Sequence, residues 1–189
     1  MDVKNILIVG VGGQGILLAS ELLSEVAFLS GCDVKKSEVH GMAQRGGVVS
    51  SHVRYGKKVY SPLIKEGDAD VLLAFEMAEA LRWSHFVRQN GVAVINEYQL
   101  IPPVALIQKL EYPENPVQQV KKRIQTVVPV SALKLVSTPK VVNIFLLGVI
   151  SNYLNLTESH WLEGLNKRVP RGTEEMNRTA FNDGRAYRS

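Results

Sequence analysis

Two glycine-rich segments in the first quarter of the chain combine an adaptable backbone with polar side chains. The first, Gly10-Val-Gly-Gly-Gln-Gly15, follows an apolar run over Val3–Val9 that is typical of a strand buried on both faces. Apolar residues then recur at helical spacing from Gly15 to Leu29, so the glycines are expected to join a strand to a helix. Such a turn leaves the first helical N–H groups unpaired at the positive end of the helix dipole. It therefore predicts a site for a phosphate-bearing ligand.

The contacts predicted for this first segment come from its backbone and from one side-chain amide. Glycine allows a ligand to approach the backbone without interference from a Cβ atom. A tight strand-to-helix turn that binds nothing remains the alternative interpretation. The predicted binding residues are Gly10, Gly12, Gly13, Gln14 and Gly15.

The second segment reads His-Gly-Met-Ala-Gln-Arg-Gly-Gly from residue 40 to residue 47 and has no helical or strand periodicity. Arg45 can bind a carboxylate or phosphate with two parallel hydrogen bonds, and the amide of Gln44 can bond an amide or carbonyl group. The other interpretation is a polar turn in which Arg45 satisfies loop carbonyls. The predicted binding residues are His40, Gln44, Arg45, Gly46 and Gly47.

The spacing Gly10-x-Gly12-x-x-Gly15 also suits a nicotinamide or flavin dinucleotide. That class of protein places an acidic residue at the end of the second strand, where it binds the ribose hydroxyls. Asp33 stands at the start of the second candidate strand, and Glu38 lies among polar residues, so the dinucleotide pattern is incomplete. A P-loop is excluded because no Gly-Lys-Ser/Thr follows the glycines.

The composition is that of one globular domain. The chain has 189 residues, of which 46% are hydrophobic and 21% charged, with a net charge of +4. Its basic residues form no stripe interleaved with aromatics, so nucleic acid is not expected as a partner. The single cysteine, Cys32, excludes an internal disulfide, and the histidines have no metal-like spacing, so no metal site is expected. With no signal peptide or membrane-spanning run, a cytoplasmic protein is expected.

The remaining patterns predict an α/β fold, a Rossmann-like three-layer α/β/α domain with a mixed sheet that occupies residues 1–189. Residues 48–54 and 59–64 are predicted to pair as a hairpin around the turn at residues 55–58. A helix is expected over residues 76–87, followed by a strand over residues 92–96. A helical tail over about 157–189 is expected to pack on a partner.

The two glycine segments, together with Ser51-His-Val-Arg54, resemble the gamma subunit or domain of 2-oxoacid:ferredoxin oxidoreductases. Within that family the chain looks most similar to the beta subunit of indolepyruvate ferredoxin oxidoreductase. Asp68-Ala-Asp70, the apolar strand after it and Glu76 are also similar to the family. The motifs cover residues 5–75 well, and the resemblance is looser up to residue 150.

The resemblance implies a reaction in which a 2-oxoacid and coenzyme A give acyl-CoA, CO2 and reduced ferredoxin. Thiamine diphosphate and iron–sulfur clusters are then expected on companion subunits, with coenzyme A as a cosubstrate at or near this chain. One cysteine cannot ligate a four-cysteine cluster. No residue of this chain is expected to be catalytic, because its contribution would be positioning and electrostatics. The isolated chain, expected to be inactive, could pair with a second copy of itself.

Two other classes of function stay open at this point. One is an independent NAD(P)- or FAD-dependent oxidoreductase, which a yellow chromophore or tight nicotinamide binding would favour. The other is a structural subunit whose glycine loops only shape an interface. Intact activity after mutation of both loops would favour that second class.

Overall fold

The computed structural model describes residues 2–41, 47–100 and 111–188. Gln44, Arg45 and Gly46 of the second glycine segment lie outside these residues. The described chain contains one six-stranded sheet with the strand order β2-β3-β1-β4-β5-β6. The strands are β1 (Lys4–Val11), β2 (Asp33–His40), β3 (Val48–Gly56), β4 (Ala69–Ala74), β5 (Val87–Asn96) and β6 (Thr126–Val130).

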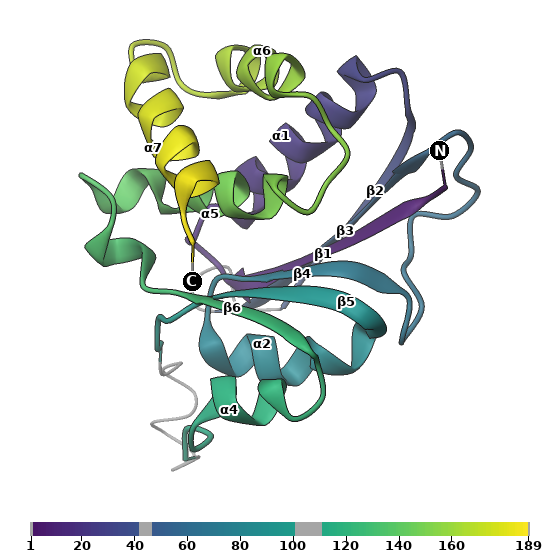
Figure 1. Cartoon of the computed structure of the whole chain (residues 1–189), viewed down its shortest axis with the longest axis vertical. Coiled ribbons are helices and arrows are strands. Elements are labelled where there is room, and N and C mark those ends of the chain that lie inside the picture. The colour runs from purple at the N-terminus through teal and green to yellow at the C-terminus, as the bar shows by residue number, and fades with distance from the viewer. Residues whose placement is uncertain (1, 42–46, 101–110, 189) are drawn as a thin grey trace.

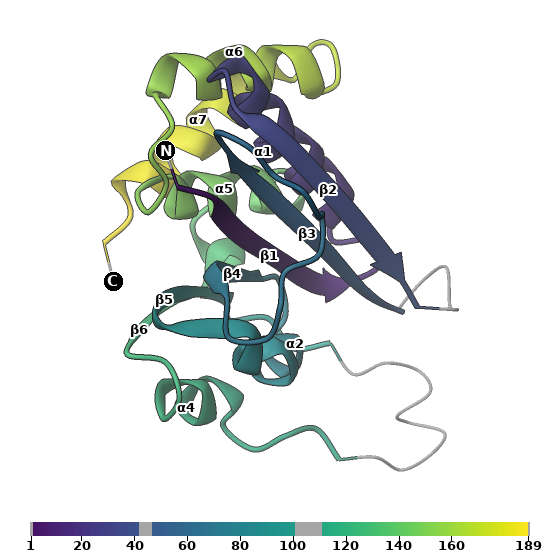
Figure 2. The same cartoon turned by 90° about the vertical axis from the view of Figure 1, so that its right-hand side faces the viewer.

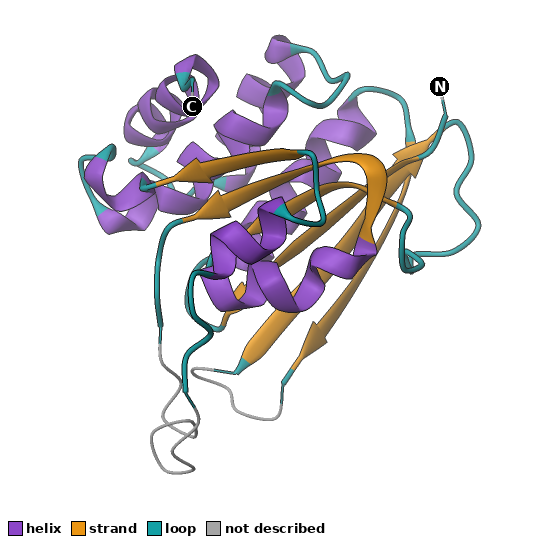
Figure 3. Ribbon diagram, turned by 60° about the horizontal axis from the view of Figure 1, so that its bottom comes forward, coloured by secondary structure: helices purple, strands orange, loops and turns teal. Residues whose placement is uncertain are grey.

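Helices cover both faces of this sheet (Figure 1), so the predicted three-layer α/β/α architecture is confirmed. One face carries α1 (Ile16–Leu29), α5 (Val142–Ser151), α6 (Glu158–Arg168) and α7 (Glu174–Ala186). The other face carries α2 (Met77–Trp83) and α4 (Pro116–Lys121), which lie in front of the strands in Figure 3. Short 3-10 turns span Ser84–Phe86, Ala132–Lys134 and Pro139–Val141.

The two faces of the sheet have separate apolar cores because successive strand side chains point to opposite sides. In β1, Ile6 and Ile8 pack toward α1 and α5, whereas Leu7 and Val9 pack toward α2. All four are fully buried, as the continuous apolar run of β1 predicts. The sheet is mixed, as expected, because β3 runs antiparallel to both β1 and β2 while β4, β5 and β6 run parallel to β1.

The predicted hairpin between residues 48–54 and 59–64 is wrong. β3 pairs instead with β2, and residues 57–68 form an irregular loop. Side chains satisfy the backbone of this loop in place of a strand ladder. The Arg54 guanidinium donates to the carbonyl oxygens of Ser61 and Leu63, while the N–H of Ile64 donates to Nδ1 of His52. Of the apolar residues that suggested a strand, Val59 and Ile64 are buried, whereas Tyr60 and Leu63 are exposed.

The helix expected over residues 76–87 ends earlier, at Trp83, and β5 begins at Val87 rather than Val92. Val87 pairs with Ala69, and the register of β5 against β4 shifts before Val92. Gly91 allows this close course, since a Cβ atom there would lie 2.9 Å from the carbonyl oxygen of Ala69. The predicted helix was too long because helix and strand boundaries are the part of a fold that local sequence patterns determine least well.

The predicted C-terminal helices are confirmed as α6 and α7. One face of α7 packs against α5 inside the domain. A Cβ atom on Gly184 would lie 2.0 Å from the carbonyl oxygen of Phe145 in α5, so only glycine permits this approach. The ring of Phe181 is fully buried beside Trp161. Packing of the tail on a partner stays a prediction, and the exposed residues of α6 and α7 are available for it.

Candidate functional site

The first glycine segment lies where the carboxyl ends of β1, β4, β5 and β6 meet. β1 has an antiparallel neighbour on one side and a parallel neighbour on the other. Ligands of open α/β sheets bind in the crevice outside the carboxyl ends of the strands, where the topology changes. The fold therefore places the predicted loop at the expected position for a ligand.

Gly13 and Gly15 have left-handed backbone conformations, with φ angles of 100° and 82°. A Cβ atom on Gly15 would lie 2.6 Å from Nδ2 of Asn143, and this amide donates to the Gly15 carbonyl oxygen over 3.4 Å. A Cβ atom on Gly13 would meet nothing within 4 Å. Gly15 is thus fixed against α5, whereas Gly13 presents open backbone to its surroundings.

The amide of Gln14 turns inward and bonds the backbone of β1 and of the residue that follows β4. Its Oε1 accepts from the N–H of Val11 at 2.8 Å, and its Nε2 donates to the carbonyl oxygen of Phe75 at 3.3 Å. Gly10 leaves room for this arrangement, because a Cβ atom there would lie 2.5 Å from Gln14 Oε1. Gly10 and the Gln14 amide therefore hold the loop against β4.

The two glycine segments meet in the structure. The N–H of Gly12 donates to the carbonyl oxygen of Gly47 at 2.9 Å. His40 ends β2 at the same edge of the sheet, because β3 aligns it through Val49 with Gly10 of β1. The segments that the sequence suggested separately are thus adjacent parts of one site.

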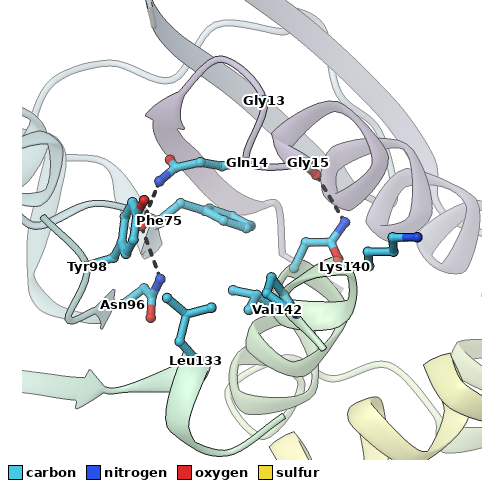
Figure 4. Close-up of a pocket in the computed structure, with 11 residues that line it drawn as sticks. Gly13, Gln14, Gly15, Phe75, Asn96, Tyr98, Leu133, Lys140 and Val142 are labelled. Atoms are coloured by element: carbon cyan, nitrogen blue, oxygen red, sulfur yellow. Dashed lines mark hydrogen bonds between the residues drawn. The ribbon is translucent and has the colours of Figure 1, made fainter. Parts of the chain in front are cut away.

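A pocket of about 400 Å³ lies on the side of the loop that faces β4 and β5 (Figure 4). In Figure 4 the side chains of Gln14, Phe75 and Asn96 converge on one side of this pocket, opposite the start of α5. Both polar groups of the Asn96 amide form hydrogen bonds within the fold. Its Nδ2 donates to the carbonyl oxygen of Phe75, and its Oδ1 accepts from the N–H of Ala132. Lining residues are Gly13, Gln14, Gly15, Phe75, Asn96, Tyr98, Leu133, Pro139, Lys140, Val142 and Asn143.

A second pocket, of about 700 Å³, lies on the side of the loop that faces β2 and β3. It shares Gly13 and Gly15 with the first pocket, so this short stretch of backbone forms a wall between the two. Its lining residues are Gly12, Gly13, Gly15, Ile16, Leu17, His40, Gly41 and Val49.

The charge pattern of both pockets suits an anion. The first turns of α1 and α5 contribute Ile16, Val142 and Asn143 to the linings, so two helix N-termini face this region. Lys140 adds a positive charge at the edge of the first pocket, where its amine points away from Gln14 and Phe75 in Figure 4. None of the described lining residues is acidic. Open glycine backbone, helix dipoles and a lysine together can bind phosphate oxygens.

The structure disfavours the dinucleotide alternative. Antiparallel β3 separates β1 from β2, whereas a Rossmann unit has its second strand beside the first. The Glu38 carboxylate accepts from Ser20 and Lys36, and Asp33 lies at the opposite end of β2 from the glycine loop. Asp33 is therefore remote from the loop, and Glu38 is paired within the fold.

The sequence did not indicate Asn143, which bonds the loop, or Lys140, which lines the first pocket, because both come from a distant part of the chain. A usable signal for Asn143 was its place as an amide among the apolar side chains of α5, all of which are buried. Glu76, which resembles the family in sequence, is buried and stabilises the start of α2. It is 1% exposed, caps α2 through the N–H of Glu79, and accepts from the hydroxyl of Tyr112.

Two histidines outside the glycine segments, His52 and His160, contact other side chains of the fold. His52 is buried beside Trp83 and Phe86, and burial lowers its pKa. His160 forms a 2.8 Å hydrogen bond with Ser30. Across residues 2–41, 47–100 and 111–188, no cluster of His, Cys, Asp and Glu could hold a metal ion. Within the same ranges, no helix has the length and apolar content to cross a membrane.

Fold and site together define an α/β protein whose glycine loop lies at a topological switch point of the sheet, between two pockets. The chain matches the family model described as pyruvate ferredoxin/flavodoxin oxidoreductase over residues 5–187, and it belongs to this family. The resemblance inferred from the glycine segments is thereby confirmed.

Curated relatives support the same assignment. An indolepyruvate oxidoreductase subunit IorB from Archaeoglobus fulgidus is 40% identical over 157 residues, which cover 80% of this chain and 78% of that protein. A subunit of the same name from Thermococcus kodakarensis is 36% identical over 199 residues, which cover 97% and 95%.

Solved structures share the fold. The keto/oxoacid ferredoxin oxidoreductase gamma subunit from Geobacter sulfurreducens superimposes with a TM-score of 0.69 at 24% identity, covering 96% of this chain and 95% of that one. The 2-oxoglutarate:ferredoxin oxidoreductase from Magnetococcus marinus, with 2-oxoglutarate, coenzyme A and succinyl-CoA bound, superimposes with a TM-score of 0.75 at 19% identity. That match covers 98% of this chain and 31% of the longer chain.

Proposed function

We propose that this chain is a subunit of a 2-oxoacid:ferredoxin oxidoreductase of the indolepyruvate or aryl-pyruvate type. The complex would convert a 2-oxoacid and coenzyme A to acyl-CoA, CO2 and reduced ferredoxin. Thiamine diphosphate and the iron–sulfur clusters belong to companion subunits in this proposal, and the isolated chain is inactive. The assignment rests on family membership and on relatives named as indolepyruvate oxidoreductase subunits.

In this proposal the glycine loop holds a phosphate group of coenzyme A. The observation that carries it is the backbone of Gly13, which has no neighbour within 4 Å of a Cβ position and borders two pockets without acidic lining residues. The N-terminal turn of α1 then orients the cosubstrate by charge and hydrogen bonding. Arg45 and Gln44 are assigned to the same cosubstrate from the sequence.

The test is a pair of substitutions at Gly13. Asn and Asp both tolerate the left-handed conformation, so Gly13→Asn and Gly13→Asp have similar shapes and differ in charge. Calorimetric titration of coenzyme A into the chain, alone and with its companion subunit, should give at least about fivefold weaker binding for Gly13→Asp than for Gly13→Asn. Equal affinities for the two variants would contradict phosphate binding at this loop. Unchanged coenzyme A kinetics in an Arg45→Ala complex would remove the role assigned to Arg45.

A second candidate, a subunit whose loops only shape an interface, is favoured by two hydrogen-bonding observations. The N–H of Gly12 is occupied by Gly47, and the amide of Gln14 is occupied by strand backbone. Under this function, Gly13→Asp would weaken assembly with the companion subunit and leave the Michaelis constant for coenzyme A unchanged. Measuring complex formation and coenzyme A kinetics on the same variant separates the two functions.

A further inference from the structure

The outer edge of β2 is a long strand edge with nothing paired to it in the described sheet. β2 is the first strand in the sheet order, and Figure 2 shows it as the outermost strand on its side. All eight of its residues, Asp33–His40, pair with β3 in one unbroken register. The strand has no proline, glycine or bulge. Such an edge is a template for pairing with another strand.

The opposite edge of the sheet is protected in a way that β2 is not. β6 contains Pro129, which has no N–H to donate. The outward carbonyl oxygen of Pro129 accepts from the hydroxyl of Tyr187 at 2.9 Å. The contrast identifies β2 as the edge that is open to a partner.

The register of β2 shows which of its backbone groups point outward. The N–H of Gly41 donates to the carbonyl oxygen of Val48, so odd-numbered residues of β2 bond to β3. The N–H and C=O groups of the even-numbered residues therefore point away from the sheet. These residues are Val34, Lys36, Glu38 and His40.

We propose that β2 pairs antiparallel with β2 of a second copy of this chain, with Ser37 on the two-fold axis. Only this register engages all four outward residues and places the Lys36–Glu38 ion pair of one copy, 2.9 Å long, against the Glu38–Lys36 pair of the other. Shifting the centre by one residue to Lys36 would set two lysines against each other at the axis. The charge pattern of the strand thus selects one self-complementary arrangement.

Apolar side chains flank this edge on both faces. On one face the exposed side chain of Val39 lies opposite Lys35 of the second copy, whose aliphatic stem would cover it. On the other face α1 lies beside the edge, since Ser20 bonds Glu38 and Lys36 lies 4.0 Å from Glu21.

The outer side of α1 also carries exposed apolar residues. Phe28 is 69% exposed and Leu17 is 43% exposed. In the paired arrangement the two copies of α1 lie on the same face of the joined sheet, where these side chains become partly covered. Because apolar side chains lie on both sides of this strand edge, covering it with a protein surface is more favourable than leaving it in water.

A cysteine at the axis tests the arrangement directly. Directly opposed Cα atoms of a non-hydrogen-bonded pair are about 4.5 Å apart, which is within the range for a disulfide. In a Cys32→Ser background of the full chain, Ser37→Cys is expected to form a disulfide-linked dimer under mild oxidation. Lys35→Cys should not link to itself, but a mixture of Lys35→Cys and Val39→Cys chains should link. Ser159→Cys, on the first turn of α6, is the matched control.

Charge reversal supplies an independent measurement by sedimentation equilibrium. Across the dimer, Lys36→Glu and Glu38→Lys each replace two attractive contacts by two repulsive ones, and each also breaks the Lys36–Glu38 pair within its own chain. Each variant should therefore weaken the dimer by about tenfold or more. The double variant, with the charges exchanged, should restore it. Glu175→Lys makes the same charge change on the 82% exposed side chain of Glu175 and should have no effect. Circular dichroism checks that each variant is folded.

Three outcomes would overturn the proposal. The first is a chain that stays monomeric at high concentration. The second is a dimer in which Ser37→Cys links no better than Ser159→Cys. The third is an edge that becomes protected from hydrogen exchange only when a companion subunit binds, which would assign it to that subunit.

Discussion

The backbone N–H of Gly12 donates to the carbonyl oxygen of Gly47 at 2.9 Å, and this bond joins the two glycine segments. It removes the Gly12 N–H from the donors available to a ligand. The N–H of Gln14 is also occupied, by the carbonyl oxygen of Val11. The donors that remain for an anion are therefore concentrated at Gly13, Gly15 and the first turn of α1.

Replacing Gly15 by alanine should destabilise the protein more than the same change at Gly31. Both glycines have φ angles near 80°, so both variants carry backbone strain of about 1–2 kcal/mol. Only at Gly15 does the new Cβ atom also meet Asn143, at 2.6 Å, whereas at Gly31 it meets nothing. Urea unfolding should show an additional loss of at least about 1 kcal/mol for Gly15→Ala. Equal midpoints would mean that Asn143 moves away freely.

Gly184→Ala should be severely destabilising although alanine favours helices. The added Cβ atom would lie 2.0 Å from the carbonyl oxygen of Phe145, and backbone cannot move aside as a side chain can. We expect a loss of about 3 kcal/mol or more in the free energy of unfolding. Asn182→Ala, at an exposed position of the same helix, is the control and should be neutral or slightly stabilising. A small effect at Gly184 would show that α7 separates from α5 at little cost.

Stability should fall as the pH drops below about 6.5, because burial lowers the pKa of His52 from its ordinary value of 6.5. The unfolded chain binds a proton in this range while the folded chain does not, so protonation favours unfolding. The decline continues until the pH reaches the lowered pKa of the folded state. His52→Asn keeps an acceptor for the N–H of Ile64 and should flatten the profile. His85→Asn, which removes a ring that is 46% exposed, is the matched control for the loss of a histidine.

Lys140→Gln should weaken binding of coenzyme A if a phosphate group lies in the pocket beside α5. Removing one charge that contacts a phosphate should reduce the affinity by about fivefold and lower its salt dependence. Lys122→Gln removes an equal charge from the exposed surface beyond α4 and serves as the control. Titration calorimetry at two ionic strengths measures both quantities. Equal losses for the two variants would attribute the effect to net charge alone.

Local patterns were sufficient for the elements that surround the first glycine segment. The apolar run of β1, the glycines and the helical spacing of α1 are contiguous, so the end of each element fixes the start of the next. The buried helix α5 was also predictable, because its residues are apolar on nearly every side. The pairing of β3 was not predictable from local patterns. Its true partner β2 is polar, whereas residues 59–64 are apolar enough to suggest a strand. Side chains of Arg54 and His52, rather than a ladder, satisfy that loop.

The sequence by itself determined that a glycine turn connects a buried strand to a helix and that a second glycine segment accompanies it. Both are local properties of residue type and spacing. Only the tertiary structure decided that Gln14 turns inward, that Asn143 fixes Gly15, and that Gly13, unlike Gly10 and Gly15, keeps open surroundings. The physical reason is distance along the chain. These contacts join residues that meet only after the sheet has formed and α5 has packed onto it.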